Sequence, residues 1–431
     1  MEKMPTAILV EIRRNIERSG LAELERLAEA AGYSVIGKYE QTRMIDSAFC
    51  MGRGRARELA IELEGSNSIP DKVIFNNRLK PSQVYNLTKT FKTEVIDRFQ
   101  LILEIFTKRA GTIEAKCQIE LAKLQYELPL AKEKVHLAKL GELPGFHGLG
   151  RYQADVYTSM IKKRISYLKK RLNEIRVQKS LHRKKRKRDA LFNVALTGYT
   201  CAGKTTLFNL LSEEALPVSN NLFTTLSTTT RSVQINGRKI LFSDTVGFID
   251  RLPHQLIDAF YSTLEEVTLA DLVLLVLDAS DPIDEFKRKL DTCISTLNAI
   301  GVFTSSIIPV LNKIDLNRTL EQYLLAASRH FKSDPLMISA KDKKGIDELI
   351  KVISGMLPQT LRLHLRMPIS ESANYLLSWA FNESDIKLIQ FDDHFLDIET
   401  EVSADYVTKF NRLIRGTGIQ LMKVEEARIH E

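Results

Sequence analysis

The sequence predicts an α/β protein built from an N-terminal parallel α/β domain, a long antiparallel helical hairpin, a P-loop α/β domain and a small C-terminal α+β module. Three patterns in the 431 residues support this prediction: apolar runs alternating with amphipathic stretches, apolar residues at the spacing of paired helices, and a strand followed by a glycine-rich loop. A chain of this length favours several domains. We place them at residues 1–111, 112–190, 191–357 and 358–431.

The N-terminal segment alternates strand-like and helix-like stretches, as a small parallel α/β domain does. Its helix-like stretches are LAELERLAEA, RARELAIELEG and PSQVYNLTKTF, the last beginning at Pro81, where a first helical turn tolerates proline. We interpret MGRGR (51–55) as a tight turn, with a second phosphate site as the alternative. The strand-like runs are AILV at 7–10, SVIG at 34–37, KVIF at 72–75 and TEVID at 93–97.

Residues 112–190 carry two apolar seams with alternating four- and three-residue spacing, which predicts two long helices packed on each other. Between the seams, residues 141–153 hold four glycines and a proline, so we expect this stretch to be the hairpin tip. Pro129 should kink the first helix. The seams are Cys117, Leu121, Leu124, Leu128, Ala131, Val135 and Ala138, and then Ile161, Ile165, Leu168, Leu172 and Ile175.

The net charge of +8 is concentrated in this hairpin. From Thr112 to Arg188 there are 20 Lys or Arg against seven Asp or Glu, a local charge of +13 that leaves −5 for the rest of the chain. Such clustering indicates a polyanionic partner, with nucleic acid the first candidate. The run HRKKRKRD (182–189) is either a solvated helix end or a contact to a phosphate backbone. We favour the contact, through Lys184, Lys185 and Arg186.

The segment after residue 190 begins with the strand-like FNVALTG and repeats strand-like runs at RSVQI, RKILF, DLVLLVLD, SIIPVLN and PLMISA. Asn236-Gly237 separates the second and third runs and predicts a two-residue hairpin, so one strand pair should be antiparallel in an otherwise parallel sheet. After Pro358, we expect a helix at 371–382, strands at 386–391 and 395–402, a helix at 404–416 and a strand at 419–424.

A phosphate-binding loop follows the first of these strands. Residues 198–205 match G-x-x-x-x-G-K-T between a strand and a helix, the context in which backbone N–H groups surround phosphate oxygens. We expect Lys204 to bridge the β- and γ-phosphates and Thr205 to ligate Mg²⁺. The predicted nucleotide contacts here are Gly198, Tyr199, Thr200, Cys201, Ala202, Gly203, Lys204, Thr205 and Thr206.

Two further stretches should sense the γ-phosphate. Asp244 ends a strand and can hold Mg²⁺ through water, while the Gly247 N–H can bond the phosphate. LFTTLSTTT (222–230) offers five threonines to close over the metal, of which we select Thr225. Phe248 stands where a glutamine commonly orients the attacking water, so we expect slow hydrolysis until a partner supplies or orders another group. The remaining predicted contacts are Phe223, Thr224, Leu226, Ser227, Thr245 and Val246.

The motif NKID (312–315) selects the base. The Asp315 carboxylate can accept hydrogen bonds from the ring N–H and exocyclic amine of guanine, and adenine offers neither, so the predicted ligand is GTP. ISAK (338–341) fits the loop that closes over the base. In this order the motifs indicate a Ras-like G domain with a GTPase centre in which Lys204, Thr225, Asp244 and Gly247 carry the catalysis. The base contacts are Asn312, Lys313, Ile314, Asp315, Ser339, Ala340 and Lys341.

With these motifs placed, the chain resembles the HflX family of ribosome-associated GTPases over about its first 360 residues. The stretches PSQVYNL (81–87), VIDRFQLILEIFTKRA (95–110), LFTTL (222–226) and DTVGFIDRLPHQLIDAFYSTLEE (244–266) are similar to signatures of that family. The resemblance implies that the N-terminal domain and hairpin dock on the large ribosomal subunit. It also implies that the hairpin tip reaches ribosomal RNA near the peptidyl-transferase centre, and that subunits are split or stalled or idle ribosomes are rescued.

The chain departs from the family in three places. The tip usually reads G-P-G-E-x-Q, whereas Gly148, Leu149 and Gly150 are followed here by Arg151, so a base replaces the acid. We expect Gly148, Gly150 and Arg151 to contact RNA. Cys201 replaces the P-loop asparagine with which relatives coordinate potassium, and a thiol is a poor ligand for a hard cation. The basic run at 183–188 is denser than the family pattern.

Composition excludes several other classes. No run of 18 uncharged apolar residues is present, the N-terminus becomes charged too early for a signal peptide, and the four cysteines form no C-x-x-C pair. We therefore expect a monomeric cytoplasmic protein with no membrane span. Two alternatives to a ribosome-stimulated GTPase stay open: a ribosome-assembly or RNA-binding factor that uses GTP with negligible turnover, and, ranked last, a tRNA-modifying GTPase.

Overall fold

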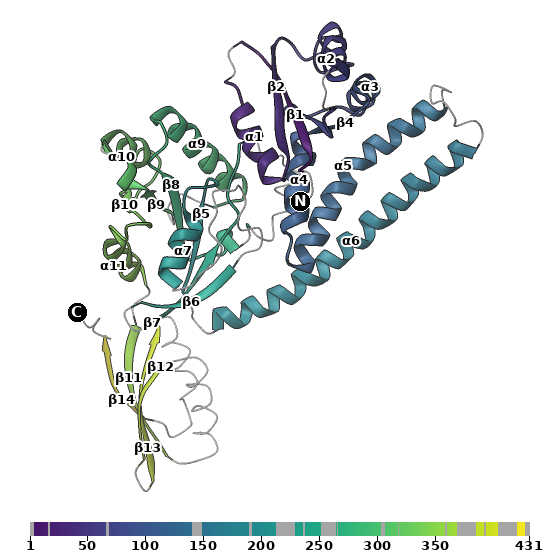
Figure 1. Cartoon of the computed structure of the whole chain (residues 1–431). Coiled ribbons are helices and arrows are strands. Elements are labelled where there is room, and N and C mark those ends of the chain that lie inside the picture. The colour runs from purple at the N-terminus through teal and green to yellow at the C-terminus, as the bar shows by residue number, and fades with distance from the viewer. Residues whose placement is uncertain are drawn as a thin grey trace.

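Three sheets and a helical hairpin make up the protein, whose structure is a computed structural model (Figure 1). The N-terminal domain lies against both the central G domain and the hairpin, and the C-terminal sheet projects from the other end of the G domain. The structure describes residues 4–15, 18–65, 69–139, 149–188, 192–212, 229–235, 238–250, 264, 266–302, 307–317, 319–357, 360–368, 385–391, 394–403 and 420–426.

The N-terminal sheet is parallel throughout, in the order β2-β1-β3-β4, which confirms the predicted α/β arrangement. The turn expected at 51–55 lies earlier, because the Asp46 carboxylate accepts bonds from the amides of Ala48 and Phe49, each 2.8 Å long, and helix α2 already begins at Arg53. The elements are β1 (Thr6–Arg13), α1 (Leu21–Ala30), β2 (Ser34–Thr42), α2 (Arg53–Gly65), β3 (Lys72–Phe75), α3 (Pro81–Phe91), β4 (Glu94–Asp97) and α4 (Arg98–Arg109).

Asp97 joins this domain to the hairpin. Its carboxylate caps α4 by accepting a bond from the Gln100 amide at 3.0 Å, and it also accepts bonds from the Leu79 amide at 3.2 Å and the Tyr126 hydroxyl at 2.8 Å. Tyr126 lies in the first hairpin helix and stacks on Phe99 with ring centroids 4.9 Å apart. Burial raises the pKa of the Asp97 carboxyl. The hairpin is therefore fastened to the N-terminal domain by a buried polar cluster.

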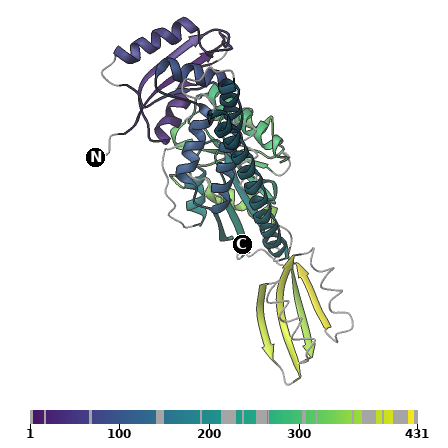
Figure 2. The same ribbon diagram turned by 90° about the vertical axis from the view of Figure 1, so that its right-hand side faces the viewer.

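The hairpin consists of α5 (Ile113–Lys139) and α6 (Leu149–Arg188), which lie side by side along most of their length (Figure 2). The predicted seam of α6 is confirmed. Between residues 156 and 178, the positions that are not exposed are Thr158, Ile161, Ile165, Leu168, Leu172 and Ile175. On α5, a second face packs against α4 and is more deeply buried than the seam, through Ala115, Ile119, Ala122 and Tyr126.

The predicted tip is too long at its C-terminal end. Helix α6 begins at Leu149, so residues 149–153 belong to its first turns, while Gly148 and residues 140–147 lie outside the described residues. Pro129 lies inside α5. Across the described residues, every helix falls short of the length or apolarity needed to cross a bilayer.

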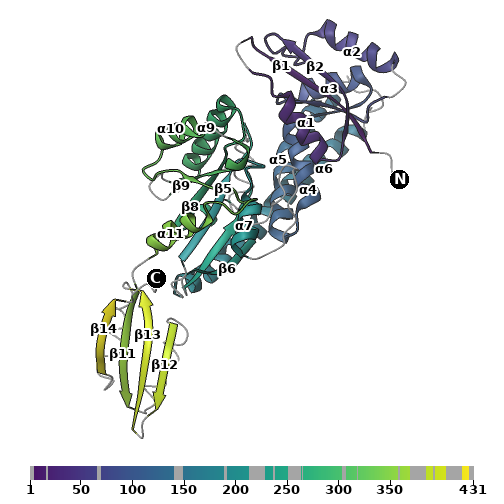
Figure 3. The same ribbon diagram turned by 60° about the vertical axis from the view of Figure 1, so that its left-hand side comes forward.

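The central sheet has the order β10-β9-β8-β5-β7-β6, and only the β6–β7 pair is antiparallel, as the Asn-Gly turn predicted (Figure 3). Its buried strand β8, LVLLVLD, is apolar along its length, as a central parallel strand requires. The elements are β5 (Phe192–Gly198), α7 (Lys204–Ser212), β6 (Thr229–Ile235), β7 (Arg238–Asp244), β8 (Leu272–Asp278), α9 (Ile283–Ala299), β9 (Ile307–Asn312), η2 (Ile314–Leu316), α10 (Glu321–Ser328), β10 (Leu336–Met337) and α11 (Ile346–Met356).

The C-terminal module is an antiparallel sheet in the order β12-β13-β11-β14. The central strand β11 (Thr360–Pro368) was not predicted, although its Leu-Arg-Leu-His-Leu-Arg-Met alternation is a strand signal. Leu363, Leu365 and Met367 are turned into the module, and its arginines face acidic residues of β13. The helices predicted at 371–382 and 404–416 lie outside the described residues. The other strands are β12 (Asp385–Phe391), β13 (Phe395–Ser403) and β14 (Gln420–Glu426).

The substitution Asp97→Asn tests the cluster that fastens the hairpin. It keeps the shape but replaces an acceptor with a donor that faces the N–H and O–H donors of the cluster, so the free energy of unfolding should fall by about 1–3 kcal/mol. Urea denaturation followed by circular dichroism measures this change. The matched control is Glu94→Gln on the same strand, where the side chain is 61% exposed and the effect should stay within about 0.5 kcal/mol. Equal effects of the two substitutions would contradict the role given to Asp97.

Candidate functional site

The glycine-rich loop leaves β5 and enters α7, as predicted. Two of its glycines are required by close contacts. Gly198 has φ of +143°, and a Cβ there would meet the Val276 carbonyl oxygen at 2.1 Å. Gly203 has φ of +92°, and a Cβ would meet the Asn312 amide at 2.2 Å. The loop is thus pressed against the neighbouring strand and against the predicted base motif.

Lys204 and Thr205 begin α7 and are almost fully buried. The Lys204 ammonium donates to the carbonyls of Gly198 at 3.1 Å and Tyr199 at 2.8 Å. Burial lowers the pKa of Lys204, and the nearby Asp244 carboxylate opposes this shift. The Lys204 ammonium is desolvated and has no carboxylate in direct contact. A bound anion would therefore stabilise its charged form strongly.

The Thr205 hydroxyl and the Asp244 carboxylate form the candidate metal site. The hydroxyl donates to Asp244 at 3.0 Å, and both residues are buried where α7 begins and β7 ends. A hydroxyl and a carboxylate are oxygen ligands of the kind Mg²⁺ prefers, and the ion completes its octahedron with water and phosphate oxygens. The donor set therefore fits Mg²⁺. Thr225, the third predicted ligand, lies outside the described residues together with Phe223, Thr224, Leu226 and Ser227.

The chain that follows Asp244 lies directly on the glycine-rich loop. The Thr200 amide donates to the Phe248 carbonyl at 2.8 Å and the Phe248 amide donates to the Gly198 carbonyl at 3.0 Å, so a parallel bridge prolongs the β5–β7 pairing. A Cβ at Gly247 would lie 2.9 Å from the Thr200 Cα and 3.0 Å from the Lys204 ammonium nitrogen. Only glycine permits this approach. Thr245 and Val246, upstream of Gly247, are buried.

The Phe248 side chain points away from the loop into the core. It is 2% exposed and belongs to an apolar cluster that also contains Leu24 and Phe99 of the N-terminal domain. In place of a water-orienting glutamine, the chain thus has an aromatic ring that packs between two domains. The buried Phe248 ring therefore does not orient a water at the loop.

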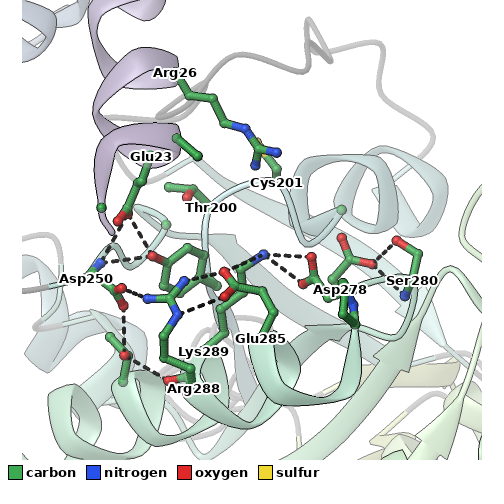
Figure 4. A pocket seen from close by; sticks show the side chains of 18 of the residues that line it. Glu23, Arg26, Thr200, Cys201, Asp250, Asp278, Ser280, Glu285, Arg288 and Lys289 are labelled. Atoms are coloured by element: carbon green, nitrogen blue, oxygen red, sulfur yellow. Dashed lines mark hydrogen bonds and ion pairs between the residues drawn. The ribbon is translucent and has the colours of Figure 1, made fainter. Parts of the chain in front are cut away.

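Five residues form what we call the interdomain network: Glu23, Arg98, Tyr199, Asp250 and Arg288. Figure 4 labels Glu23, Asp250 and Arg288 of this network. The Tyr199 hydroxyl donates to the Glu23 carboxylate at 2.7 Å and accepts from the Asp250 amide at 3.0 Å. Arg98 binds the Glu23 carboxylate at 3.1 Å and the Asp250 carbonyl at 3.0 Å. The Asp250 carboxylate pairs with Arg288 and accepts from the Thr292 hydroxyl at 3.0 Å.

This network connects α1 and α4 of the N-terminal domain with the glycine-rich loop, the 246–250 segment and α9 of the G domain. Burial and the Glu23 carboxylate raise the pKa of Tyr199, so the hydroxyl keeps its proton as a donor. Lys289 lies 5.2 Å from the centroid of the Tyr199 ring and pairs with Asp281 at 2.7 Å. Because charged groups so poorly exposed require partners, the two domains are held together in one defined geometry.

Asn312, Asp315 and the 338–341 loop, where we predict the base contacts, lie close together. Asn312 is buried and ties the glycine-rich loop to that loop, donating to the Ala202 carbonyl at 2.9 Å and accepting from the Ala340 amide at 3.0 Å. The Ser339 hydroxyl donates to the exposed Asp315 carboxylate at 2.6 Å and lowers its pKa. Lys313 pairs with Asp278 at the end of β8. Asp315 is thus an ionised acceptor facing outward. Ile314 begins the short helix η2, and Lys341 is exposed.

A pocket of about 1240 Å³ contains the loop and is closed on one side by the N-terminal domain. Its lining includes Cys201 and Thr206 of the G domain, but also Glu23, Arg26 and Glu29 of α1. The sequence motifs include pocket-lining residues of the G domain but none of those on α1. A weak signal existed, because Glu23, Arg26 and Glu29 recur with a spacing of three, but nothing local assigns that face of α1 to a residue 176 positions away.

The predicted RNA contacts do not gather at this site. Gly150 and Arg151 lie in the first turns of α6, and Lys184, Lys185 and Arg186 lie in its last turns, at the opposite end of a 40-residue helix. The structure describes the helical backbone at these positions and not their side chains. Tip and basic run can therefore contact one RNA surface only along the length of α6.

Three family models match successive parts of the chain. The family models described as GTP-binding GTPase N-terminal, GTP-binding GTPase middle region and 50S ribosome-binding GTPase match residues 18–107, 109–186 and 193–313. The GTPase HflX of Thermofilum pendens is 46% identical over 351 residues, which cover 80% of this chain and 82% of that protein. The GTPase HflX of Methanocaldococcus jannaschii is 43% identical, with 86% and 90% covered.

A solved structure is similar to most of the chain. The crystal structure of the SsGBP and GDP complex superposes with a TM-score of 0.50 at 30% sequence identity, covering 82% of this chain and 98% of that one. The likeness extends over the N-terminal domain and hairpin as well as the G domain.

The substitution Tyr199→Phe isolates the central hydroxyl of the interdomain network. It removes the 3.0 Å acceptor of the Asp250 amide and leaves only the longer bond to the Glu23 carboxylate at 3.4 Å. This weakens the hold on the 246–250 segment, which must move if a γ-phosphate is to fit between Lys204 and Gly247. The affinity for a non-hydrolysable GTP analogue should therefore rise about 5- to 10-fold relative to GDP, the equivalent of one hydrogen bond. Fluorescence titration with labelled nucleotides measures the ratio.

The matched control is Tyr33→Phe, which also removes a tyrosine hydroxyl bonded to a carboxylate, that of Glu104 at 2.7 Å, but wholly within the N-terminal domain. Its analogue-to-GDP ratio should equal that of the unmodified protein. If Tyr199→Phe also leaves the ratio unchanged, the hydroxyl does not hold the segment closed.

Proposed function

Because the chain belongs to the HflX family of GTPases, we propose that it binds the large ribosomal subunit in its GTP-bound form, hydrolyses GTP there and so splits ribosomes or rescues stalled or idle ones. A match to the 50S ribosome-binding GTPase model over residues 193–313 supports the partner. The observation that carries the proposal is the interdomain network, because it connects the nucleotide loop to the domain that holds the hairpin.

The nucleotide roles follow from the site. Backbone amides of the 198–205 loop surround the phosphates, Lys204 bridges the β- and γ-phosphates, and Asp315 selects guanine. Thr205, Asp244 and Thr225 would hold Mg²⁺, which would neutralise charge on the phosphates. The thiol of Cys201 is unsuited to an alkali cation, so we expect hydrolysis that does not depend on potassium.

GTP and the closed interdomain network exclude each other in this proposal. The Lys204 ammonium is bonded to two loop carbonyls, and Gly247 lies against it. A γ-phosphate that accepts from both Lys204 and the Gly247 N–H needs room between them. GTP therefore displaces residues 246–250, and Asp250 carries the displacement to Glu23 and Arg98. Ligands act by such differential contacts with two states.

The N-terminal domain transmits this shift to the hairpin through Asp97 and Tyr126. Helix α6 buries only its seam and exposes basic side chains along its described length, including Lys162, Lys163, Lys169, Lys170 and Arg171. An exposed basic helix of this length suits the phosphate backbone of ribosomal RNA, with the tip residues Gly148, Gly150 and Arg151 at one end.

One experiment tests the function. Single-turnover GTP hydrolysis and cosedimentation are measured with separate small and large ribosomal subunits, with the protein loaded with GDP or a GTP analogue. We expect the analogue-loaded protein to sediment with the large subunit and hydrolysis to accelerate at least about 100-fold on it, since Phe248 supplies no water-orienting group. Binding without acceleration would instead favour the alternative, a GTP-gated assembly or RNA-binding factor with negligible turnover.

The basic run at the end of α6 has its own test. Reversing the charges of Lys184, Lys185 and Arg186 to Glu should weaken binding to the large subunit. It should also reduce the slope of log K against log salt by about 2–3, one unit for each phosphate that is no longer neutralised. Cosedimentation at several salt concentrations gives both quantities.

The control reverses three exposed basic residues of the G domain, Arg329, Lys332 and Lys351, for the same change in net charge. These residues should make no direct phosphate contact, so only long-range electrostatic attraction should weaken. The slope of log K against log salt should then change by less than about one unit. Equal slopes for the two triple variants would mean that the run at 184–186 is a solvated helix end.

A further inference from the structure

Arg26 is a pocket residue for which the GTPase motifs provide no role. It lies on α1 of the N-terminal domain, is exposed, and lines the same pocket as Thr200, Cys201 and Lys204. Figure 4 shows its guanidinium extending from α1 toward Cys201 of the glycine-rich loop. A cation from another domain thus faces the loop on which the phosphates are held.

The other cations of this pocket are occupied. Arg98 and Arg288 are bound into the interdomain network, and Lys289 and Lys313 pair with Asp281 and Asp278. Arg18, which also lines the pocket, pairs with Asp284 at 3.5 Å, and both side chains are exposed. Within the described part of the chain, Arg26 forms no ion pair or hydrogen bond. It is the pocket guanidinium that can turn onto a phosphate without breaking an existing contact.

The interdomain network fixes the helix that carries Arg26. Glu23, one turn earlier on the same side of α1, is bound by Tyr199 and Arg98, while Leu24 and Leu27 are fully buried in the core. In the closed state the backbone of α1 is therefore held at the pocket mouth while the Arg26 side chain has freedom to move, and the network sets where Arg26 stands relative to the loop. A helix that carries a mobile guanidinium at the pocket is suited to stabilise negative charge that develops only in a transition state.

We propose that Arg26 is a catalytic residue of GTP hydrolysis, supplied in cis by the N-terminal domain to the γ-phosphate. Water attacks the γ-phosphorus, the bond between that phosphorus and the β–γ bridging oxygen breaks, and the bond's electron pair stays on GDP. One proton of the water stays on the released phosphate as its hydroxyl, and the other passes to a phosphate oxygen or to the solvent. Negative charge shifts to the bridging and γ-oxygens in the transition state, and the guanidinium of Arg26 stabilises it by donating to those oxygens.

A catalytic Arg26 accounts for a combination that the motifs leave unexplained. Residue 248 offers no water-orienting side chain, yet the site has the loop, Lys204 and the Thr205–Asp244 pair of a hydrolase. A guanidinium from α1 makes hydrolysis depend on where the N-terminal domain stands. The rate is then sensitive to any partner that moves that domain.

The test compares Arg26→Ala and Arg26→Lys with Arg57→Ala, an exposed arginine on α2 of the same domain that is remote from the pocket. Single-turnover GTP hydrolysis is measured without ribosomes, together with the affinities for GDP and for GDP with aluminium fluoride, which mimics the transferring phosphoryl group. We expect Arg26→Ala to slow hydrolysis roughly 20-fold, the difference a cis arginine makes among GTPases. Its affinity for GDP should be unchanged, and the additional affinity conferred by aluminium fluoride should be lost.

Two further readouts distinguish chemistry from structure. Added guanidinium at millimolar concentration should restore part of the Arg26→Ala rate, and Arg26→Lys should retain more activity than Arg26→Ala. Arg57→Ala should behave as the unmodified protein. A rate for Arg26→Ala that is unchanged or increased, or a loss of GDP affinity that matches the loss of rate, would overturn the proposal. The measurement contains no ribosomes, so failure to bind ribosomes would count against the proposed function alone.

Discussion

The hydroxyl of Tyr199 lies between a carboxylate of one domain and a backbone amide of another, and the arrangement of the whole molecule depends on that contact. Glu23, Arg98, Asp250 and Arg288 surround it, and each satisfies a charge that would otherwise be poorly solvated at the domain interface. Such a group of residues has few intermediate states, because removing one member leaves its neighbours unsatisfied. The network is therefore either closed as a unit or opened as a unit, which is what a two-state device requires.

The consequences extend in two directions from this contact. Toward the G domain, Asp250 closely follows Gly247, whose approach to Lys204 leaves no room for a side chain. Toward the N-terminal domain, the Asp97 cluster fixes α4 to α5, so a rotation of that domain must carry the 40-residue helix α6 with it. In the proposed opening, a displacement at the loop would thus be passed to the hairpin. The buried Phe248, which binds the two domains together through apolar contacts, adds to the closed state.

Much of the fold was predictable because its signals are local. The seam of α6, the parallel N-terminal sheet, the one antiparallel pair of the central sheet and the P-loop between β5 and α7 all follow from periodicity or from residues adjacent in the chain. Strand β11 was missed even though its alternation is plain. The predicted tip was too long, since glycine content does not reveal where a first helical turn begins. The pocket residues on α1, by contrast, could not be predicted from local sequence. Glu23 and Tyr199 are 176 residues apart, and no local pattern encodes which face of a helix meets another domain.

Whether GTP opens the interdomain network is measured most directly by amide hydrogen exchange. The amides of Thr200, Phe248 and Asp250 all donate across the loop contact in the closed state. Exchange followed by mass spectrometry over residues 199–200 and 246–250 should show protection with GDP and faster exchange, by a factor of about ten, with a non-hydrolysable GTP analogue. The amide exchange rate of α1 around Glu23 should also rise with the GTP analogue. Equal protection of these amides in the two nucleotide states would contradict the opening of the network, since the γ-phosphate would then leave it closed.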